Sequence, residues 1–248
     1  MLKNARLRLG VALWLAAMAG VVVLSLTVLP QILAMAPLRA PLWVAVAASV
    51  LQSGVLLALA VWVGVALSQR LGLGAPVFEA ALSGTGAWVA LKPQLIPAAI
   101  VGLFTGGMLV LLGRITPAEL LALGQTIKIP VAAKLLYGGV TEEVLMRWGL
   151  MTFLVWLPWR FIQKRLGPPR PTYVIGAIFM AALLFGAGHL PAAAAMGVSL
   201  TAPVVTWIIV GNTVPGVLCG FLYWRKGLEA AILAHALAHA VAVLLGAM

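Results

Sequence analysis

Long apolar segments, broken only by short polar or proline-containing stretches, run through the whole chain of 248 residues. A helix needs about 20 mostly apolar residues to cross the hydrocarbon core of a bilayer. About seven segments of that length can be delimited, at residues 9–29, 41–67, 94–113, 130–158, 172–191, 202–224 and 228–246. Because 64% of the residues are hydrophobic and 8% are charged, a soluble globular domain is excluded. The sequence predicts an all-α fold, a polytopic transmembrane helical bundle of about seven to eight spans, with residues 1–248 forming a single integral membrane domain.

Prolines and glycines mark the expected ends of these spans. Proline starts or stops a helix because it lacks the amide hydrogen and fixes φ, and the segments are punctuated by Pro30, Pro41, Pro130, Pro158, Pro171 and Pro191. Residues 71–92 are rich in glycine and proline, and we expect a loop or an interfacial or re-entrant piece there. A break that would make an eighth element is favoured in the sixth segment by Gly211, Pro215, Gly216 and Gly220.

The N-terminal region is basic and leads into the first apolar segment, as in a secretory signal peptide, and residues 34–36 resemble a cleavage site. The apolar run is longer than the roughly 7–15 residues of a signal core, so we interpret it as a retained first span. Positive residues concentrate on cytoplasmic segments. With the N-terminus in the cytoplasm, only Arg39, Arg114 and Lys128 fall on outer segments, and this orientation is therefore predicted.

The net charge of +11 raises the question of a nucleic acid partner. The basic residues are scattered at the ends of apolar runs, where they act as orientation signals and contact lipid headgroups. The lipid bilayer, and no nucleic acid, is therefore the expected partner. The single cysteine, Cys219, lies in an apolar run and is expected to be a packed core residue.

A few ionisable residues remain inside the predicted spans. Burying such a group costs several kcal/mol unless it has a partner, so each is a candidate functional residue. They are Lys134, Glu142, Glu143, Arg147, His189, His235 and His239.

The stretch TEEVLMRWG, residues 141–149, contains two of the five acidic residues of the chain. On a helix, Glu143 and Arg147 are at positions i and i+4, with the glutamate N-terminal, which favours an ion pair. Glu142 points about 100° away from Glu143 and is available for general acid or base chemistry. The alternative is a helix-packing ion pair beside a protonated glutamic acid.

The three histidines extend this polar set to two further spans. His235 and His239 are four residues apart in LAHALAHA and share one helix face, where the flanking alanines allow close helix packing. His189 lies beside glycines in LLFGAGHLP. The spacing of His235 and His239 is that of a zinc-peptidase helix, but the glutamate of the HExxH motif is absent. There is also no Gly-x-Ser-x-Gly motif and no aspartate, which leaves a water activated by carboxylate and imidazole groups, with imidazoles as oxyanion donors.

These residues resemble the three motifs of the CPBP family, the CAAX protease and bacteriocin-processing family with its Rce1-type prenyl endopeptidases. The matching residues are Glu142-Glu143-x-x-x-Arg147, Phe185-x-x-x-His189 and His235-x-x-x-His239, and the stretch before the third motif is also similar. The resemblance extends over residues 134–243. We expect residues 130–248 to form the motif-bearing catalytic core.

The resemblance implies a metal-independent, glutamic-type intramembrane endopeptidase without a cofactor. Glu142 and His189 would activate the water, His235 and His239 would form the oxyanion hole, and Glu143 and Arg147 would support the first motif. The last position is commonly Asn in the prenyl-protein proteases, whereas here it is His239; imidazole also donates a hydrogen bond but has a different shape and titrates.

The expected partner is a membrane-associated peptide or protein substrate, and the expected location is a prokaryotic cell membrane. Two other functions use the same residues: a non-catalytic membrane scaffold or immunity protein, and a metal- or proton-coupled transporter. The predicted spans put His189 near the outer end of its helix and Glu142 near the middle of the membrane. Either the fifth helix extends past Pro191, or the predicted boundaries of the spans are wrong.

Overall fold

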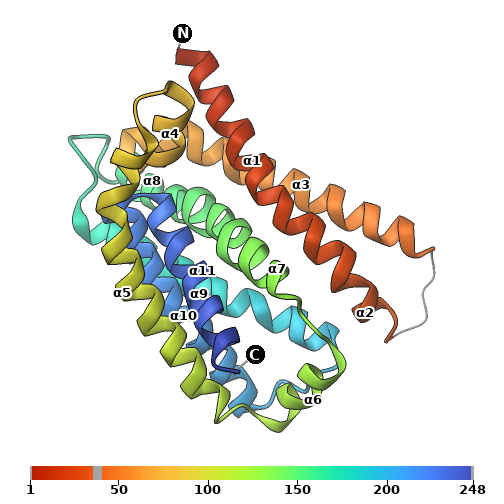
Figure 1. The fold of residues 1–248 in the computed structure, drawn as a ribbon. Coiled ribbons are helices and arrows are strands. Elements are labelled where there is room, and N and C mark those ends of the chain that lie inside the picture. Colours follow the sequence, from red (N-terminus) through yellow and green to blue (C-terminus); the bar gives the residue numbers. More distant parts are fainter. Residues whose placement is uncertain (1, 36–40, 247–248) are drawn as a thin grey trace.

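The computed structural model describes residues 2–35 and 41–246, and these residues form helices and no strands (Figure 1). In chain order the helices are α1 (Leu2–Thr27), α2 (Leu29–Leu33), α3 (Leu42–Leu67), the 3-10 turn η1 (Ser68–Leu71), α4 (Pro76–Ser83), α5 (Ala87–Gly113), α6 (Ala118–Thr126), α7 (Val131–Ala133), the π-helical stretches η2 (Lys134–Thr141) and η3 (Val144–Met151), α8 (Thr152–Phe161), α9 (Pro171–Ala195), α10 (Ala202–Lys226) and α11 (Leu228–Leu244). The predicted all-α fold is confirmed.

All seven predicted segments are helical over most of their length, but fewer of them are long enough to span a membrane. Five helical segments have the length and hydropathy of spans: Asn4–Leu33, Leu42–Leu71, Ala87–Gly113, Pro171–Ala195 and Ala202–Lys226. A sixth exists if Ala118–Thr126 and Val131–Phe161, which are bent by 115°, form one broken span. The last helix, α11, has 17 residues and is about 25 Å long. By length and hydropathy the described chain therefore has five or six spans, not seven or eight.

The predicted break in the sixth segment is wrong. Helix α10 is continuous over Ala202–Lys226 with Pro215 inside it, as transmembrane helices tolerate when neighbouring groups satisfy the freed backbone atoms. The glycines of α10 allow α9 to pack closely against it. A Cβ on Gly216 would lie 2.9 Å from Ala182 Cβ, and one on Gly220 would lie 2.9 Å from Ile178 Cγ2 of α9.

The fifth helix does not end at Pro191. Helix α9 continues to Ala195, so His189 lies more than a turn inside the helix, and the apparent mismatch in depth with Glu142 disappears. Pro158 likewise lies inside α8. Both prolines were predicted to be helix ends.

Residues 71–92 contain a helix of their own. Helix α4 is docked on the start of α11, where Glu229 Oε1 accepts hydrogen bonds of 2.9 Å from the backbone amides of Val77 and Phe78. Gly227 has a φ of 114° and lies so close to Pro76 that a Cβ would be 2.5 Å from its ring. Glycine is therefore required there, and these contacts fix the start of the helix that carries His235 and His239.

The segment Val131–Phe161, called the motif helix below, crosses the centre of the bundle and changes its winding around the two glutamates. Residues on either side of Glu142 and Glu143 are π-helical, a rare geometry that is frequent at functional sites. Thr141 Oγ1 donates to Ala17 O of α1 at 2.6 Å. Gly139 lies so close to α11 that a Cβ would be 2.9 Å from Ala236 Cβ. The predicted close approach at the alanines of α11 is confirmed.

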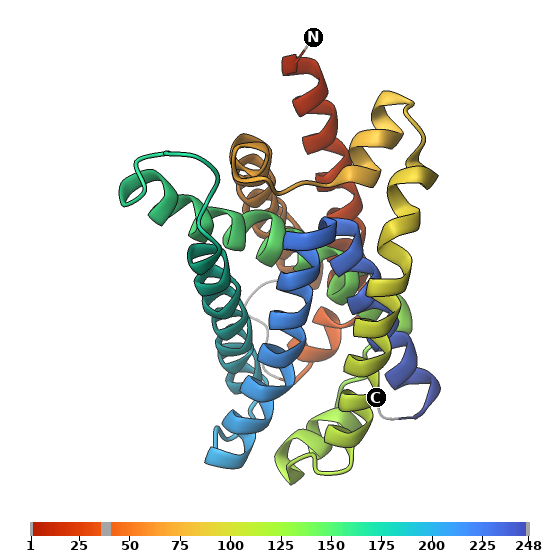
Figure 2. The ribbon, with the colours of Figure 1, turned by 90° about the vertical axis from the view of Figure 1, so that its left-hand side faces the viewer.

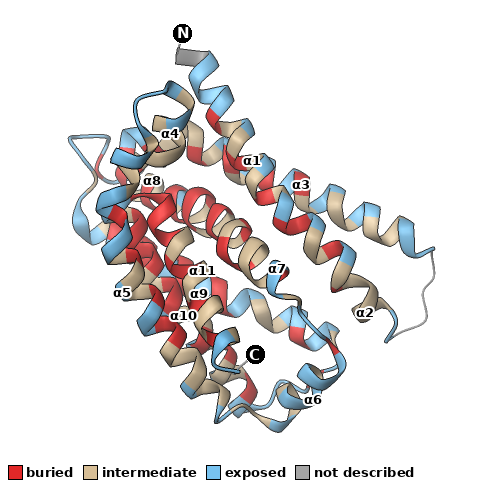
Figure 3. Cartoon of the chain, viewed as in Figure 1, coloured by how far each residue is buried: buried red, intermediate tan, exposed pale blue. Residues whose placement is uncertain are grey.

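Buried residues lie where the motif helix packs against α1, α3, α9, α10 and α11, and the outward faces remain apolar (Figures 1 and 3). Trp43, Trp62 and Val89 are 73%, 67% and 75% exposed. Apolar residues exposed around the whole bundle are suited to contact lipid chains. Cys219 is 2% exposed and belongs to the main core, as predicted.

Figure 2 shows α11 next to α5 on one side of the bundle. Gly102 and Gly106 of α5 allow this contact, because a Cβ on Gly106 would lie 2.6 Å from Val241 Cβ. Helix α11 is thus packed between α5 and the motif helix, which leaves its histidines little freedom to move.

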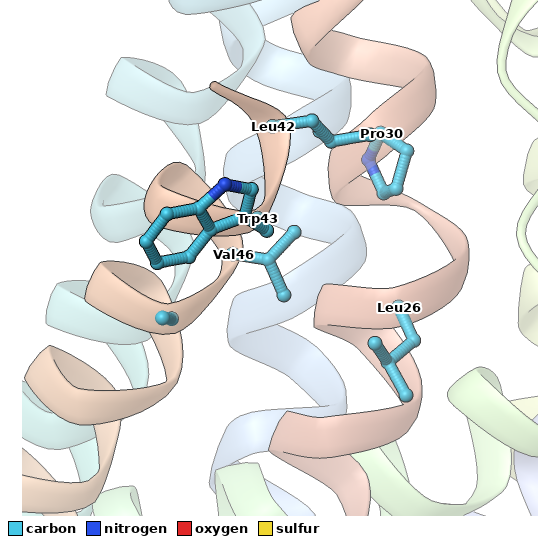
Figure 4. A pocket seen from close by; sticks show the side chains of 6 residues that line it. Leu26, Pro30, Leu42, Trp43 and Val46 are labelled. Carbon is cyan, nitrogen blue, oxygen red and sulfur yellow. The ribbon is translucent and has the colours of Figure 1, made fainter. Parts of the chain in front are cut away.

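A separate pocket of about 580 Å³ lies between the end of α1 and the start of α3 (Figure 4). Its lining is apolar and contains no ionisable residue: Leu26, Pro30, Leu42, Trp43, Val46 and Ala47. None of the predicted site residues lines this pocket. The candidate site is therefore described from the contacts among its own side chains.

Candidate active site

The carboxyl group of Glu142 lies between two imidazoles that come from different helices. Its Oε1 is 3.9 Å from His189 Nε2, and its Oε2 is 3.9 Å from His235 Nε2. The side chain of Glu142 is 17% exposed, so it is largely buried but still partly accessible to solvent. The structure therefore brings together Glu142, His189 and His235, as the sequence predicts.

His189 is oriented by its own helix. Its Nδ1 is 2.8 Å from Phe185 O, one turn earlier in α9. A carbonyl oxygen can only accept, so Nδ1 carries the hydrogen and donates it. In the neutral ring, Nε2 then has the lone pair, and this is the nitrogen that faces Glu142.

Phe185 is a shared neighbour of the site residues. Its ring packs edge to face against His189, with centroids 4.8 Å apart, and also against His235 at 6.4 Å. The guanidinium of Arg147 lies 5.4 Å from the same ring centroid. The sequence motif includes Phe185, but its role was not predicted. The four-residue spacing to His189 is the signal that places it one turn away on the same face.

Glu143 is fully buried, and its carboxylate contacts two other side chains. Its Oε2 is 3.1 Å from Arg147 Nε, and its Oε1 is 2.7 Å from His235 Nδ1. The first contact confirms the predicted i, i+4 ion pair. Arg147 also donates from Nη2 to Gly216 O of α10 at 3.1 Å. Glu143 therefore orients His235 as well as anchoring Arg147, and this second contact was not predicted.

His239 lies one turn after His235 on α11. Its ring stacks on that of His235, with centroids 4.9 Å apart and planes 21° apart. The ring fits against Gly138 of the motif helix, where a Cβ would lie 2.6 Å from His239 Nε2. Its Nδ1 is buried and, among the described residues, forms no hydrogen bond. The close approach at Gly138 was not predicted, because nothing in the sequence pairs the two residues.

No group of three or more His, Cys, Asp or Glu side chains in the described part of the chain is arranged to hold a metal ion. The histidine nitrogens that face away from Glu142 are already used: Nδ1 of His189 by the carbonyl of Phe185, and Nδ1 of His235 by Glu143.

Residues 125–241 match the family model described as type II CAAX prenyl endopeptidase Rce1-like. These residues form an Rce1-like domain. The Rce1-like domain contains Glu142, Glu143, Arg147 and the three histidines, and its family is one of proteases. The apolar helices make the chain an integral membrane protein. No curated protein and no solved structure matches the chain.

Proposed function

We propose that the chain is a metal-independent glutamic endopeptidase that hydrolyses a peptide bond of a membrane-associated substrate. One observation carries the proposal: a shielded carboxyl, Glu142, lies 3.9 Å from the Nε2 atoms of both His189 and His235. That separation is longer than a direct hydrogen bond and is suited to groups that bind one water molecule together.

In the proposed hydrolysis, Glu142 takes one proton from the water, and the water oxygen attacks the carbonyl carbon of the substrate. His189 accepts a hydrogen bond from the same water through the lone pair on Nε2, because its Nδ1 donates to Phe185 O. When the tetrahedral intermediate collapses, the C–N bond breaks and Glu142 returns its proton to the leaving amine. Glu142 is thus base and then acid in one cycle.

His235 and His239 are proposed to stabilise the oxyanion. Because Nδ1 of His235 donates to Glu143, His235 has to be doubly protonated to donate from Nε2 as well. The adjacent Glu143 carboxylate balances the charge of that imidazolium. Stacking places His239 beside His235, so donors from both rings are available to one carbonyl oxygen. Donors of this kind, fixed in advance, typically contribute about 10²–10³-fold in rate each.

Supporting groups hold these side chains in place. Arg147 contacts Glu143, Gly216 O and the face of Phe185, and thereby links the motif helix to α9 and α10. The site is built on helices rather than loops, which favours precise orientation. The outward apolar surface supports a reaction within or close to the bilayer.

Cleavage by the purified full-length protein is the direct test. The protein in phosphatidylcholine liposomes is incubated with a dye-labelled, farnesylated peptide ending in Cys-Val-Val-Met, with its unfarnesylated counterpart and with a library of hydrophobic peptides, and the products are identified by mass spectrometry. Hydrolysis at a peptide bond is the expected result. No hydrolysis of any of them would favour a scaffold or immunity protein instead.

Metal analysis of the same preparation separates the proposed mechanism from a metallopeptidase. We expect activity to survive chelation. Stoichiometric zinc together with loss of activity on chelation would contradict the metal-independent mechanism.

A further inference from the structure

Three cations lie close together in the loop that joins α8 to α9. Lys164, Arg165 and Arg170 fall within seven residues, and all three are exposed. The chain has five acidic residues, and none of them belongs to this loop. Within the described residues the three cations form no ion pair. Residues 161–170, called the basic loop below, therefore present positive charge that no ion pair in the described part of the chain neutralises.

The backbone of the basic loop has an unusual conformation. Lys164 and Arg165 have φ angles of 56° and 63°, and no other described residue except glycine has a positive φ. A side chain with a Cβ is disfavoured in this left-handed conformation. Two such residues in succession persist only where the surrounding structure imposes the conformation, and strain of this kind is typical of ligand-binding segments.

A buried side chain, Gln163, imposes the shape of the basic loop. Gln163 is 8% exposed, and its Nε2 donates to the backbone carbonyls of Leu166 and Pro168. Its Oε1 accepts from the backbone amide of Arg170 at 3.1 Å. The indole of Trp159 donates to a further carbonyl of the loop at 2.9 Å. The cations are therefore attached to a fixed backbone rather than to an open, freely moving one.

Exposed apolar side chains accompany the cations. Phe161, Ile162 and Leu166 are 62%, 69% and 74% exposed. The loop lies at the outer edge of the bundle, towards the end where the N-terminus lies (Figures 1 and 2). This is the end predicted to face the cytoplasm, where the surface of the leaflet is negative. Cations beside exposed apolar groups are typical of segments that lie in the headgroup region of a bilayer.

We propose that the basic loop is a binding surface for anionic phospholipids and prefers them to zwitterionic ones. The cations bind the lipid phosphate, to which arginine can donate two hydrogen bonds at once. The exposed apolar residues favour a lipid over a nucleic acid, because acyl chains can cover them. This role goes beyond the proposed hydrolysis, since the loop contains none of the residues assigned to the site.

A fluorophore in the loop measures lipid binding without turnover. Bimane is attached to Leu166→Cys in the full-length protein, where the native Cys219 is only 2% exposed. The labelled protein in dodecylmaltoside micelles is titrated with dioleoyl phosphatidylglycerol and, separately, with dioleoyl phosphatidylcholine. A cation near an anionic headgroup contributes about fivefold in affinity. With three cations we expect phosphatidylglycerol to bind about 100-fold more tightly than phosphatidylcholine.

Substitutions assign this preference to the loop. Lys164→Asn with Arg165→Asn removes two cations but keeps the backbone, because asparagine tolerates the left-handed conformation. The preference should fall to about fivefold. The matched control is Arg225→Gln with Lys226→Gln, two adjacent exposed cations at the end of α10, which should leave it unchanged. Arg170→Gln should lower the preference about fivefold, and it provides the test if the double asparagine variant does not fold.

Three outcomes would overturn the proposal. Equal binding of the two lipids by the wild-type loop would exclude recognition of the anionic headgroup. Equal losses in the loop variant and in the α10 control would assign the preference to overall charge. A response to glycerol phosphate as strong as that to phosphatidylglycerol would assign the loop to a soluble phosphate ester. None of these measurements requires hydrolysis, so failure of the proposed function and failure of lipid binding are distinguished.

Discussion

Glu143 Oε1 and His235 Nδ1 are 2.7 Å apart although 92 residues separate them in sequence. This buried contact joins the motif helix to α11 and determines which nitrogen of His235 faces Glu142. The same carboxylate pairs with Arg147, so one side chain connects the position of His235 to the ion pair of the motif helix.

Removing Arg147 should therefore destabilise the protein. In Arg147→Ala, Glu143 keeps His235 but loses its guanidinium partner, and breaking a buried ion pair by deleting one member costs about 3–5 kcal/mol. Thermal unfolding of the purified variant in detergent, followed by tryptophan fluorescence, should show a clearly lower melting temperature than wild type. An unchanged melting temperature would show that the ion pair contributes little. Arg160→Ala, at the end of α8 and outside the site, is the control.

Gly138→Ala should reduce activity by displacing His239. A Cβ would lie 2.6 Å from His239 Nε2, closer than real contacts, so the ring or the helix has to shift. Catalytic geometry tolerates displacements of only about 0.5 Å. The control is Gly188→Ala, next to His189, where a Cβ would meet nothing within 4 Å.

Hydrolysis rates of the two alanine variants decide this point. A selective loss in Gly138→Ala, with both variants folded, is expected. Equal rates in Gly138→Ala and Gly188→Ala would mean that the position of the His239 ring does not matter for catalysis.

His239→Asn should keep much of the activity, because the amide also donates a hydrogen bond. His239→Ala should lose about 10²–10³-fold in turnover, the typical cost of one oxyanion donor. Turnover numbers with saturating peptide distinguish the variants. If wild type, His239→Asn and His239→Ala turned over alike, His239 would be a packing residue that only supports His235.

Features set by spacing within one helix were predicted correctly from sequence. The Glu143–Arg147 pair follows from i, i+4 geometry, and the shared face of His235 and His239 follows in the same way. The Glu143–His235 contact depends on the register between two helices, and residue spacing carries no information on it.

The errors in the spans have a physical cause as well. Pro191 was expected to end its helix because proline removes a backbone hydrogen bond, yet α9 continues to Ala195, since packed transmembrane helices accommodate such breaks. The π-helical winding on either side of Glu142 and Glu143 was also not predictable, because helix propensities do not distinguish α from π turns.

The most direct measurement is the hydrolysis rate of Glu142→Gln beside that of wild type. The amide keeps the size of the side chain but cannot take a proton, so we expect a loss of about 10²–10⁴-fold in rate with an unchanged melting temperature. Full activity of a folded Glu142→Gln protein on a peptide that the wild type cleaves would contradict the central claim that Glu142 activates the water.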